Sequence, residues 1–154
     1  MFEFLGTDLA VVPQMAARDA SEVDLVPRTR VVKPRLPGTP GEVVDLSVLS
    51  GRENLAQALI LRLLTPRGSL AALGHGSYGS ELHRLIGRLK TEELRSLCRA
   101  YVLEVVQQEP RVENTAVEFA FDPARETQDS FVFTVAVQPK DQGQPVGLTL
   151  EFAL

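Results

Sequence analysis

The chain has 154 residues, of which 44% are hydrophobic and 23% charged, a length and composition typical of a single globular domain and not of a disordered chain. A formal net charge of −4 argues against nucleic acid as a partner, and the chain has no run of about 18 apolar residues that would predict a membrane span. Cys98 is the single cysteine, which excludes an internal disulfide and a four-cysteine zinc site.

The first 41 residues predict an extended arm that holds one short strand. The opening segment MFEFLGTDLA lacks a basic region followed by a long apolar run, so we expect no signal peptide and a cytoplasmic protein. Five of the ten prolines precede Gly41, and each fixes its own φ and disfavours helix at the residue before it. Residues 13–41 are therefore expected to be extended, with a short strand at residues 9–12.

Four positive charges fall within eight residues of this arm. They are Arg28, Arg30, Lys33 and Arg35. They follow an acidic stretch at residues 19–24. One interpretation is a solvated arm, and the other is a strap that becomes ordered on an acidic surface of a partner protein.

From Arg52 the pattern predicts a helix that ends before Pro66 and Gly68. Gln57 and Arg62 are the only strongly polar positions in its interior. A helix that is apolar on nearly every face is a buried one, so we expect this segment to be the core helix.

Two further helices are predicted before residue 110. Residues 80–89 carry apolar side chains at helical spacing. These are Leu82, Leu85, Ile86 and Leu89. Thr91 is a suitable N-cap for the third helix, whose apolar stripe places Cys98 in the core, and Pro110 ends it.

After Pro110 the apolar period changes from 3.6 to 2, which predicts strands at residues 117–121, 131–137 and 146–154. The short link PKDQGQP favours an antiparallel hairpin between the last two. The predicted fold is α+β, with three helices packed on one face of a small, mostly antiparallel sheet.

Motifs for chemistry are weak. GHGSYG at residues 74–79 matches G-x-G-x-x-G, but the strand that should precede it and the parallel strand that should follow are missing, so a tight turn is the better interpretation. His75 and His83 lack a metal-binding spacing, and no G-x-S-x-G motif is present. A glycosidase needs only two carboxylates, which the sequence cannot exclude. We expect no catalytic residue, no cofactor and no metal.

The triplet Glu109-Pro110-Arg111 joins the third helix to the first strand. Proline forces a break there and leaves an acid and a base on either side of a rigid corner. One interpretation is a helix terminator with a local ion pair. The other is a docking point at which Arg111 offers its guanidinium to a partner.

The order of three segments resembles the gpW/gene-product-25-like baseplate wedge proteins. These segments are VDLSVLSGRENLAQALILRLLTPRGSLAALGHGSYGSELHRLIGR, then a helix that ends in QEPR, and then alternating strands. These occur in contractile phage tails, type VI secretion systems and extracellular contractile injection systems. The resemblance covers about residues 42–121, and GTDLAVV at 6–12 is similar to the start of the family. It implies a baseplate and sheath-initiator domain at residues 42–154, preceded by an arm at residues 1–41 that is longer and richer in proline than in the family.

The resemblance also implies partners. Glu109, Pro110 and Arg111 would contact the helical core bundle of the baseplate wedge proteins, and the sheath protein would extend the sheet by strand exchange. We expect that pairing at an edge formed by residues 146–154 or by residues 131–137. Its residues would be Val146, Leu148, Thr149, Leu150 and Phe152.

Several copies would stand in a symmetric baseplate assembled in the cytoplasm, and a contact with the central hub or spike is left open. Some relatives carry a tail-lysozyme label, so a peptidoglycan hydrolase is the alternative function. The kind of machine (phage tail, type VI system or released particle) is not decided by the sequence.

Overall fold

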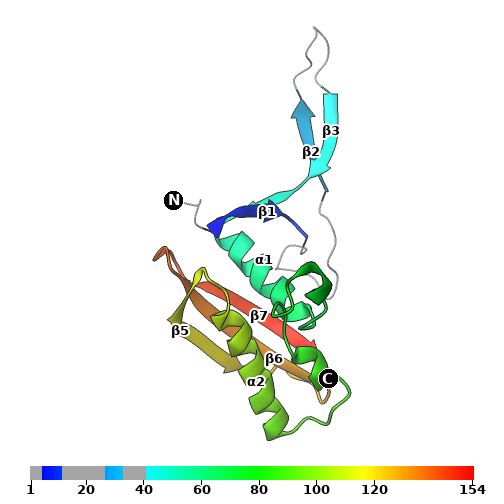
Figure 1. The fold of residues 1–154 in the computed structure, drawn as a ribbon, viewed down its shortest axis with the longest axis vertical. Helices are drawn as coiled ribbons and strands as arrows, with labels where there is room; N and C mark the ends of the chain where they lie inside the picture. The colour runs from blue at the N-terminus through cyan, green and yellow to red at the C-terminus, as the bar shows by residue number, and fades with distance from the viewer. Residues whose placement is uncertain (1–4, 12–26, 33–40) are drawn as a thin grey trace. The chain divides into compact units, whose positions relative to one another are not determined.

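The computed structural model describes residues 5–11, 27–32 and 41–154 (Figure 1). In chain order its elements are β1 (Thr7–Leu9), β2 (Pro27–Val32), β3 (Gly41–Leu46), β4 (Val48–Ser50), α1 (Gly51–Leu64), the 3-10 turns η2 (Ala71–Leu73) and η3 (Leu82–Leu85), α2 (Glu92–Gln107), β5 (Val112–Phe121), β6 (Ser130–Pro139) and β7 (Val146–Ala153). The chain forms two compact units, Met1–Gln57 and Ala58–Leu154. The division predicted after residue 41 stays a prediction.

In the first unit, β1 pairs with β4 and β2 pairs with β3, both antiparallel. The N-terminal segment is bonded to α1 through Gln57, which is almost fully buried. Its Nε2 donates to the carbonyl of Leu9 at 2.8 Å, and its Oε1 accepts from the amide of Val11 at 2.9 Å. Asn54 Nδ2 likewise donates to the carbonyl of Leu5 at 2.9 Å. A buried side-chain amide is stable here because its hydrogen bonds are satisfied.

The short strand predicted at residues 9–12 is found at Thr7–Leu9 instead. Arg28 and Arg30 lie in β2, where they stand opposite Asp45 and Val43 of β3. Lys33 and Arg35 lie outside the described residues.

In the second unit, α2 lies across one face of a three-stranded sheet in the order β5-β6-β7 (Figure 1). The Thr91 hydroxyl accepts from the amide of Leu94 at 3.2 Å, which confirms the predicted N-cap. The buried side of α2 is its predicted apolar stripe. It consists of Leu94, Cys98, Val102, Val105 and Val106. Burial raises the pKa of the Cys98 thiol to about 12, so this cysteine is a core residue.

The sheet contributes alternate side chains to the same core, as its period-2 pattern predicts. At these alternate positions Phe131, Phe133, Val135, Val137 and Leu148 are fully buried. Val132, between two of them in β6, is fully buried as well. Phe119 stacks on Phe133 with ring centroids 5.3 Å apart, and Phe121 lies 5.6 Å from Phe131. The hairpin between β6 and β7 is antiparallel, as expected from its turn-rich link.

The prediction of an α-helix at residues 80–89 is wrong, because this segment forms only the 3-10 turn η3. Leu82 and Leu85 are buried, but the chain becomes extended at Ile86 and Gly87 takes a left-handed φ of +77°. The described part of the chain therefore has two α-helices, not three. None of the helices in the described ranges has the length and apolarity needed to cross a membrane.

Candidate functional site

The corner between α2 and β5 is fixed by backbone hydrogen bonds on both sides of Pro110. The amide of Glu109 donates to the carbonyl of Val106 at 3.1 Å, and the amide of Val112 donates to the carbonyl of Glu109 at 3.1 Å. Val112 is fully buried and Pro110 is exposed. The corner is therefore rigid, and it presents Pro110 at the surface.

Glu109 does not face outward. Its side chain is only 4% exposed, and its Oε1 accepts from Nε of Arg111 at 2.6 Å. Its Oε2 lies 3.8 Å from Nη2 of Arg62 in α1. A buried carboxylate requires such cationic neighbours, so Glu109 holds two guanidinium groups in place from within the chain.

Arg62 connects this corner to the glycine-rich turn. Its guanidinium lies over the ring of Tyr78, 4.7 Å from the centroid, and its Nη1 donates to the carbonyl of Gln108 at 3.4 Å. Burial is the main cause that raises the pKa of Tyr78, and the nearby carboxylate of Glu109 adds to it, while Arg62 opposes it. The aromatic ring and the cation thus stack at the edge of the corner.

Gly79 explains the position of Tyr78. Its φ is +106°, and a Cβ there would collide with the carbonyl oxygen of Thr65 and lie 2.9 Å from the amide nitrogen of Arg67. The two chain segments can approach only because Gly79 has no side chain. The interpretation of GHGSYG as a turn is confirmed, and within the described residues no βαβ unit surrounds it.

Arg67 extends the group of charged residues. Its Nη1 lies 2.7 Å from Oε1 of Glu104, and this hydrogen bond raises the pKa of the guanidinium. Gln108 Nε2 donates to the same carboxylate at 3.4 Å. Within the described residues of this group, Nε of Arg62 and both Nε and Nη2 of Arg67 are buried donors without an acceptor.

We call this group the arginine cluster. Its members are Arg62, Arg67, Tyr78, Glu104, Glu109 and Arg111. Three guanidiniums against two carboxylates leave one net positive charge. The sequence indicated Glu109 and Arg111, and it marked Arg62 as a polar residue in an apolar helix. Nothing in the spacing indicated that Arg67, Tyr78 and Glu104 join them.

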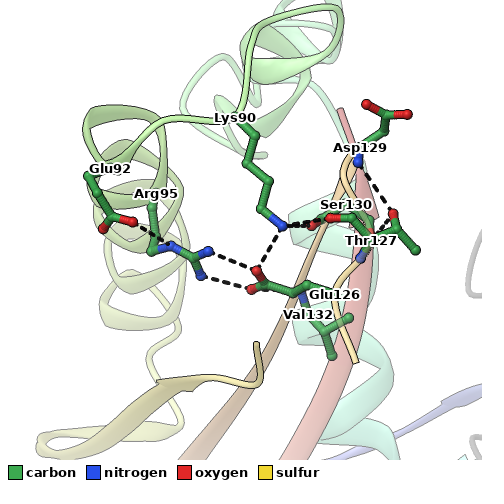
Figure 2. A network of polar contacts seen from close by, with 8 residues as sticks. All are labelled: Lys90, Glu92, Arg95, Glu126, Thr127, Asp129, Ser130 and Val132. Atoms are coloured by element: carbon green, nitrogen blue, oxygen red, sulfur yellow. Dashed lines mark hydrogen bonds and ion pairs between the residues drawn. The ribbon is translucent and has the colours of Figure 1, made fainter. Parts of the chain in front are cut away.

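A second charged network lies at the other end of α2 (Figure 2). Both carboxylate oxygens of Glu126 accept from Arg95, each at 2.8 Å, and Lys90 Nζ lies 2.9 Å from Oε2. Lys90 also donates to the carbonyls of Thr127 and Ser130, both at 2.7 Å. Arg95 and then Lys90 lower the pKa of Glu126 to about 2. This network ties the β5–β6 connection to the start of α2.

The strand β7 forms one edge of the sheet. Among the described residues it pairs with β6 alone, over the eight positions from Val146 to Ala153, without a bulge. The opposite edge, β5, has an irregularity between Val112 and Val117. The alternative that residues 131–137 form the edge is wrong, because β6 lies between β5 and β7 and both of its sides are paired.

The amide groups on the free side of β7 can be assigned. The amide of Leu154 donates to the carbonyl of Asp129 at 2.7 Å, in register with the ladder. Bonded and non-bonded positions alternate in an antiparallel pair, so the even-numbered residues of β7 bond to β6. The backbone groups that point away from the sheet therefore belong to the odd-numbered residues, which are Gly147, Thr149, Glu151 and Ala153.

The side chains of β7 alternate as predicted. Val146 and Leu148 are buried, Leu150 and Phe152 are half-buried, and Thr149 is exposed. Thr149 Oγ1 lies 3.0 Å from Oγ1 of Thr134 on the face away from α2. The apolar side of this strand is thus used in the core, while its backbone edge pairs with no other described strand.

His75 and His83 are both exposed, and Nδ1 of His83 lies 3.2 Å from the carbonyl oxygen of Ser80. Within the described ranges, no three histidine, cysteine or acidic side chains gather closely enough to hold a metal ion. The two acidic side chains at 3–4% exposure, Glu109 and Glu126, are both bound by basic residues. Arg95 and Lys90 hold the pKa of Glu126 at about 2, far below the value that a general acid needs near neutral pH.

No family model matches the sequence, and no curated protein matches it. A crystal structure of a Geobacter sulfurreducens protein, described as a candidate tail lysozyme, has a similar fold, with a TM-score of 0.55 and 18% identity. The match covers 66% of this chain and 89% of that one. The chain therefore shares the mixed α+β fold of a protein that is described as a candidate tail lysozyme.

Proposed function

We propose that this chain is a structural baseplate component of a contractile injection machine. In this proposal it joins the baseplate wedges to the first sheath ring and starts sheath assembly by strand exchange. The observation that carries the proposal is the open, regular edge of β7, whose outward donors include the amide of Thr149. An unpaired edge is a template for a strand of another chain.

The arginine cluster would serve the other contact, with the helical core bundle of the wedge proteins. Arg111 is 22% exposed at its side chain and Pro110 is exposed, so both reach the surface. Glu109 would act indirectly, because its carboxylate orients Arg111 and Arg62 and does not reach the surface. Guanidiniums held in this way lose less side-chain entropy on binding than mobile ones would.

The chain would be built into the particle in several copies in the cytoplasm. The basic residues of the arm would add a contact with an acidic neighbour. Of these, Arg28 and Arg30 lie on a paired strand, which is a suitable support for such a contact.

A proline at position 149 tests the strand exchange. Thr149→Pro removes one outward donor from the edge and leaves the apolar side of β7 unchanged. We expect a folded protein and baseplates that carry no sheath, seen by electron microscopy. Thr149→Val is the matched control, because it keeps the amide and removes only the hydroxyl next to Thr134. Sheaths of normal length on a folded Thr149→Pro protein would contradict the proposal.

The name of the similar Geobacter protein favours one alternative, a peptidoglycan hydrolase. The binding of Glu109 and Glu126 to basic residues argues against it. A turbidity assay of the purified chain on bacterial cell walls separates the two functions. We expect no clearing, whereas clearing that is lost on substitution of one carboxylate would support the hydrolase.

A further inference from the structure

The segment between η3 and α2 exposes two large apolar side chains, Ile86 at 60% and Leu89 at 86%. We call residues 86–89 the apolar loop. An exposed apolar surface that is rimmed by polar residues is typical of a protein-binding site. The apolar loop is not used by the proposed contacts at Arg111 and β7.

The apolar loop is held at both ends. On one side Leu82 is 5% exposed and Leu85 is fully buried. On the other side Lys90 binds Glu126 and two backbone carbonyls of the β5–β6 connection (Figure 2). Gly87 has a φ of +77°, which allows the chain to turn between the two apolar side chains. The surface is therefore preformed.

Its charge is positive although the whole chain is acidic. Between residues 82 and 91 there is no acidic residue, whereas Arg84, Arg88 and Lys90 are basic. Arg84 is paired with Glu81 and Lys90 with Glu126. The guanidinium of Arg88 contacts no acidic side chain within the described part of the chain, and Arg88 is exposed between Ile86 and Leu89. A carboxylate of a partner is the complementary group.

We propose that the apolar loop docks an acidic amphipathic helix of a partner protein. An amphipathic helix has an apolar stripe that would cover Ile86 and Leu89, and carboxylates beside that stripe would meet Arg88. The loop also borders the end of the open edge strand, because Lys90 and the amide of Leu154 both bind the connection at residues 127–130. A partner could occupy both surfaces together.

Peptide binding tests the proposal with the purified full chain. The probe is a fluorescent helical peptide with leucines at positions i, i+3, i+4 and i+7 and glutamates beside them. A second peptide carries lysines in place of the glutamates. By fluorescence anisotropy we expect the glutamate peptide to bind at least tenfold more tightly. Arg88→Glu should reverse the preference, because it inverts the charge between the two anchors.

The anchors are tested by Ile86→Ser combined with Leu89→Ser, which should weaken binding of the glutamate peptide at least tenfold. Leu73→Ser is the matched control, since Leu73 is 73% exposed but lies outside the loop, and it should leave binding unchanged. All three side chains are exposed, so circular dichroism should show no loss of folding. Thr149→Pro should bind the peptide normally, which separates this proposal from the one on strand exchange.

Three outcomes would overturn the inference. One is equal affinity for the two peptides, or a preference that Arg88→Glu does not reverse. Another is a dimer in sedimentation experiments that the double serine variant disrupts, because the occupant would then be a second copy of this chain. The last is binding to vesicles with anionic lipids in place of the glutamate peptide, which would make the loop a membrane contact.

Discussion

At the scale of single residues, Glu109 and Arg111 have different tasks although they stand two positions apart. Glu109 is buried and supplies the internal counter-charge, while Arg111 reaches the surface beside Pro110. A substitution at Glu109 therefore alters both Arg62 and Arg111 at once. A substitution at Arg111 removes a surface cation and leaves Glu109 near Arg62.

We predict that Arg111→Ala folds but does not assemble into baseplates. Removing its bond to Glu109 should lower the free energy of unfolding by about 1–3 kcal/mol, less than the roughly 5–15 kcal/mol that stabilises a typical domain. Thermal melts by circular dichroism and particle counts by electron microscopy check the two parts. Arg111→Lys is the matched variant, because it keeps the positive charge but lacks the planar set of N–H donors of a guanidinium. Normal particle numbers from Arg111→Ala would show that the corner is only a helix terminator.

The lowered pKa of Glu126 predicts that the stability of the fold depends on pH. Its pKa falls from 4.5 in the unfolded chain to about 2 in the folded one, chiefly through Arg95. The ionised carboxylate therefore stabilises the fold above pH 4.5, and this contribution disappears as the pH falls toward 2. We expect Glu126→Gln to cost on the order of 2–3 kcal/mol at pH 7 and almost nothing at pH 2.

The control for this prediction is Glu92→Gln. Glu92 lies 3.6 Å from Arg95 but is 88% exposed, so its pair with Arg95 should contribute little. Urea unfolding at several pH values measures both variants. A cost for Glu126→Gln that does not change between pH 7 and pH 2 would mean that shape, and not charge, determines the effect.

At the scale of elements, two glycines with left-handed φ should respond differently to the same substitution. At Gly87 an added Cβ meets nothing within 4 Å, so Gly87→Ala should cost only the conformational strain, about 1–2 kcal/mol. At Gly79 the Cβ would also collide with the backbone at Thr65 and Arg67, so we expect a loss of about 3 kcal/mol or more. Denaturant unfolding of both variants tests this order. Equal losses would show that the two chain segments can separate easily.

The elements that the sequence predicted correctly are those whose apolar period is long and unbroken. The stripe of α2 and the alternation of β6 and β7 each extend over eight or more residues. The prediction of a helix at residues 80–89 failed although the apolar residues have helical spacing. Gly87 has a left-handed φ that ends the helical pattern, and Ile86 and Leu89 are exposed. Four positions at helical spacing cannot show whether a short segment is buried by α2 or left for a partner.

The arginine cluster could be predicted only in part, for a similar reason. Arg62 and Glu109 are 47 positions apart in the chain, and periodicity does not show that they lie 3.8 Å apart in the fold. The strand order is equally invisible to periodicity, so the sequence left open whether residues 131–137 or 146–154 form the edge. The pairing of β6 with both β5 and β7 shows that residues 146–154 form the edge.

At the scale of the whole molecule, the arm is expected to matter more for assembly than for stability. Among the described residues β2 pairs only with β3, so deleting residues 14–40 removes one strand and leaves the core of the second unit intact. We predict a change in melting temperature of no more than about 4 °C, and fewer chains incorporated into particles. Differential scanning calorimetry measures the first quantity. A drop much larger than this would show that the arm belongs to the core.

The central claim is that a strand of the sheath adds to the free edge of β7, and amide hydrogen exchange tests it most directly. In the free chain the amides of Leu148, Leu150 and Phe152 bond to β6 and should exchange slowly, while those of Thr149 and Glu151 should exchange fast. In sheathed particles, labelled whole and dissociated under quench conditions, all five should be slow. Fast exchange at Thr149 and Glu151 in sheathed particles would contradict the account.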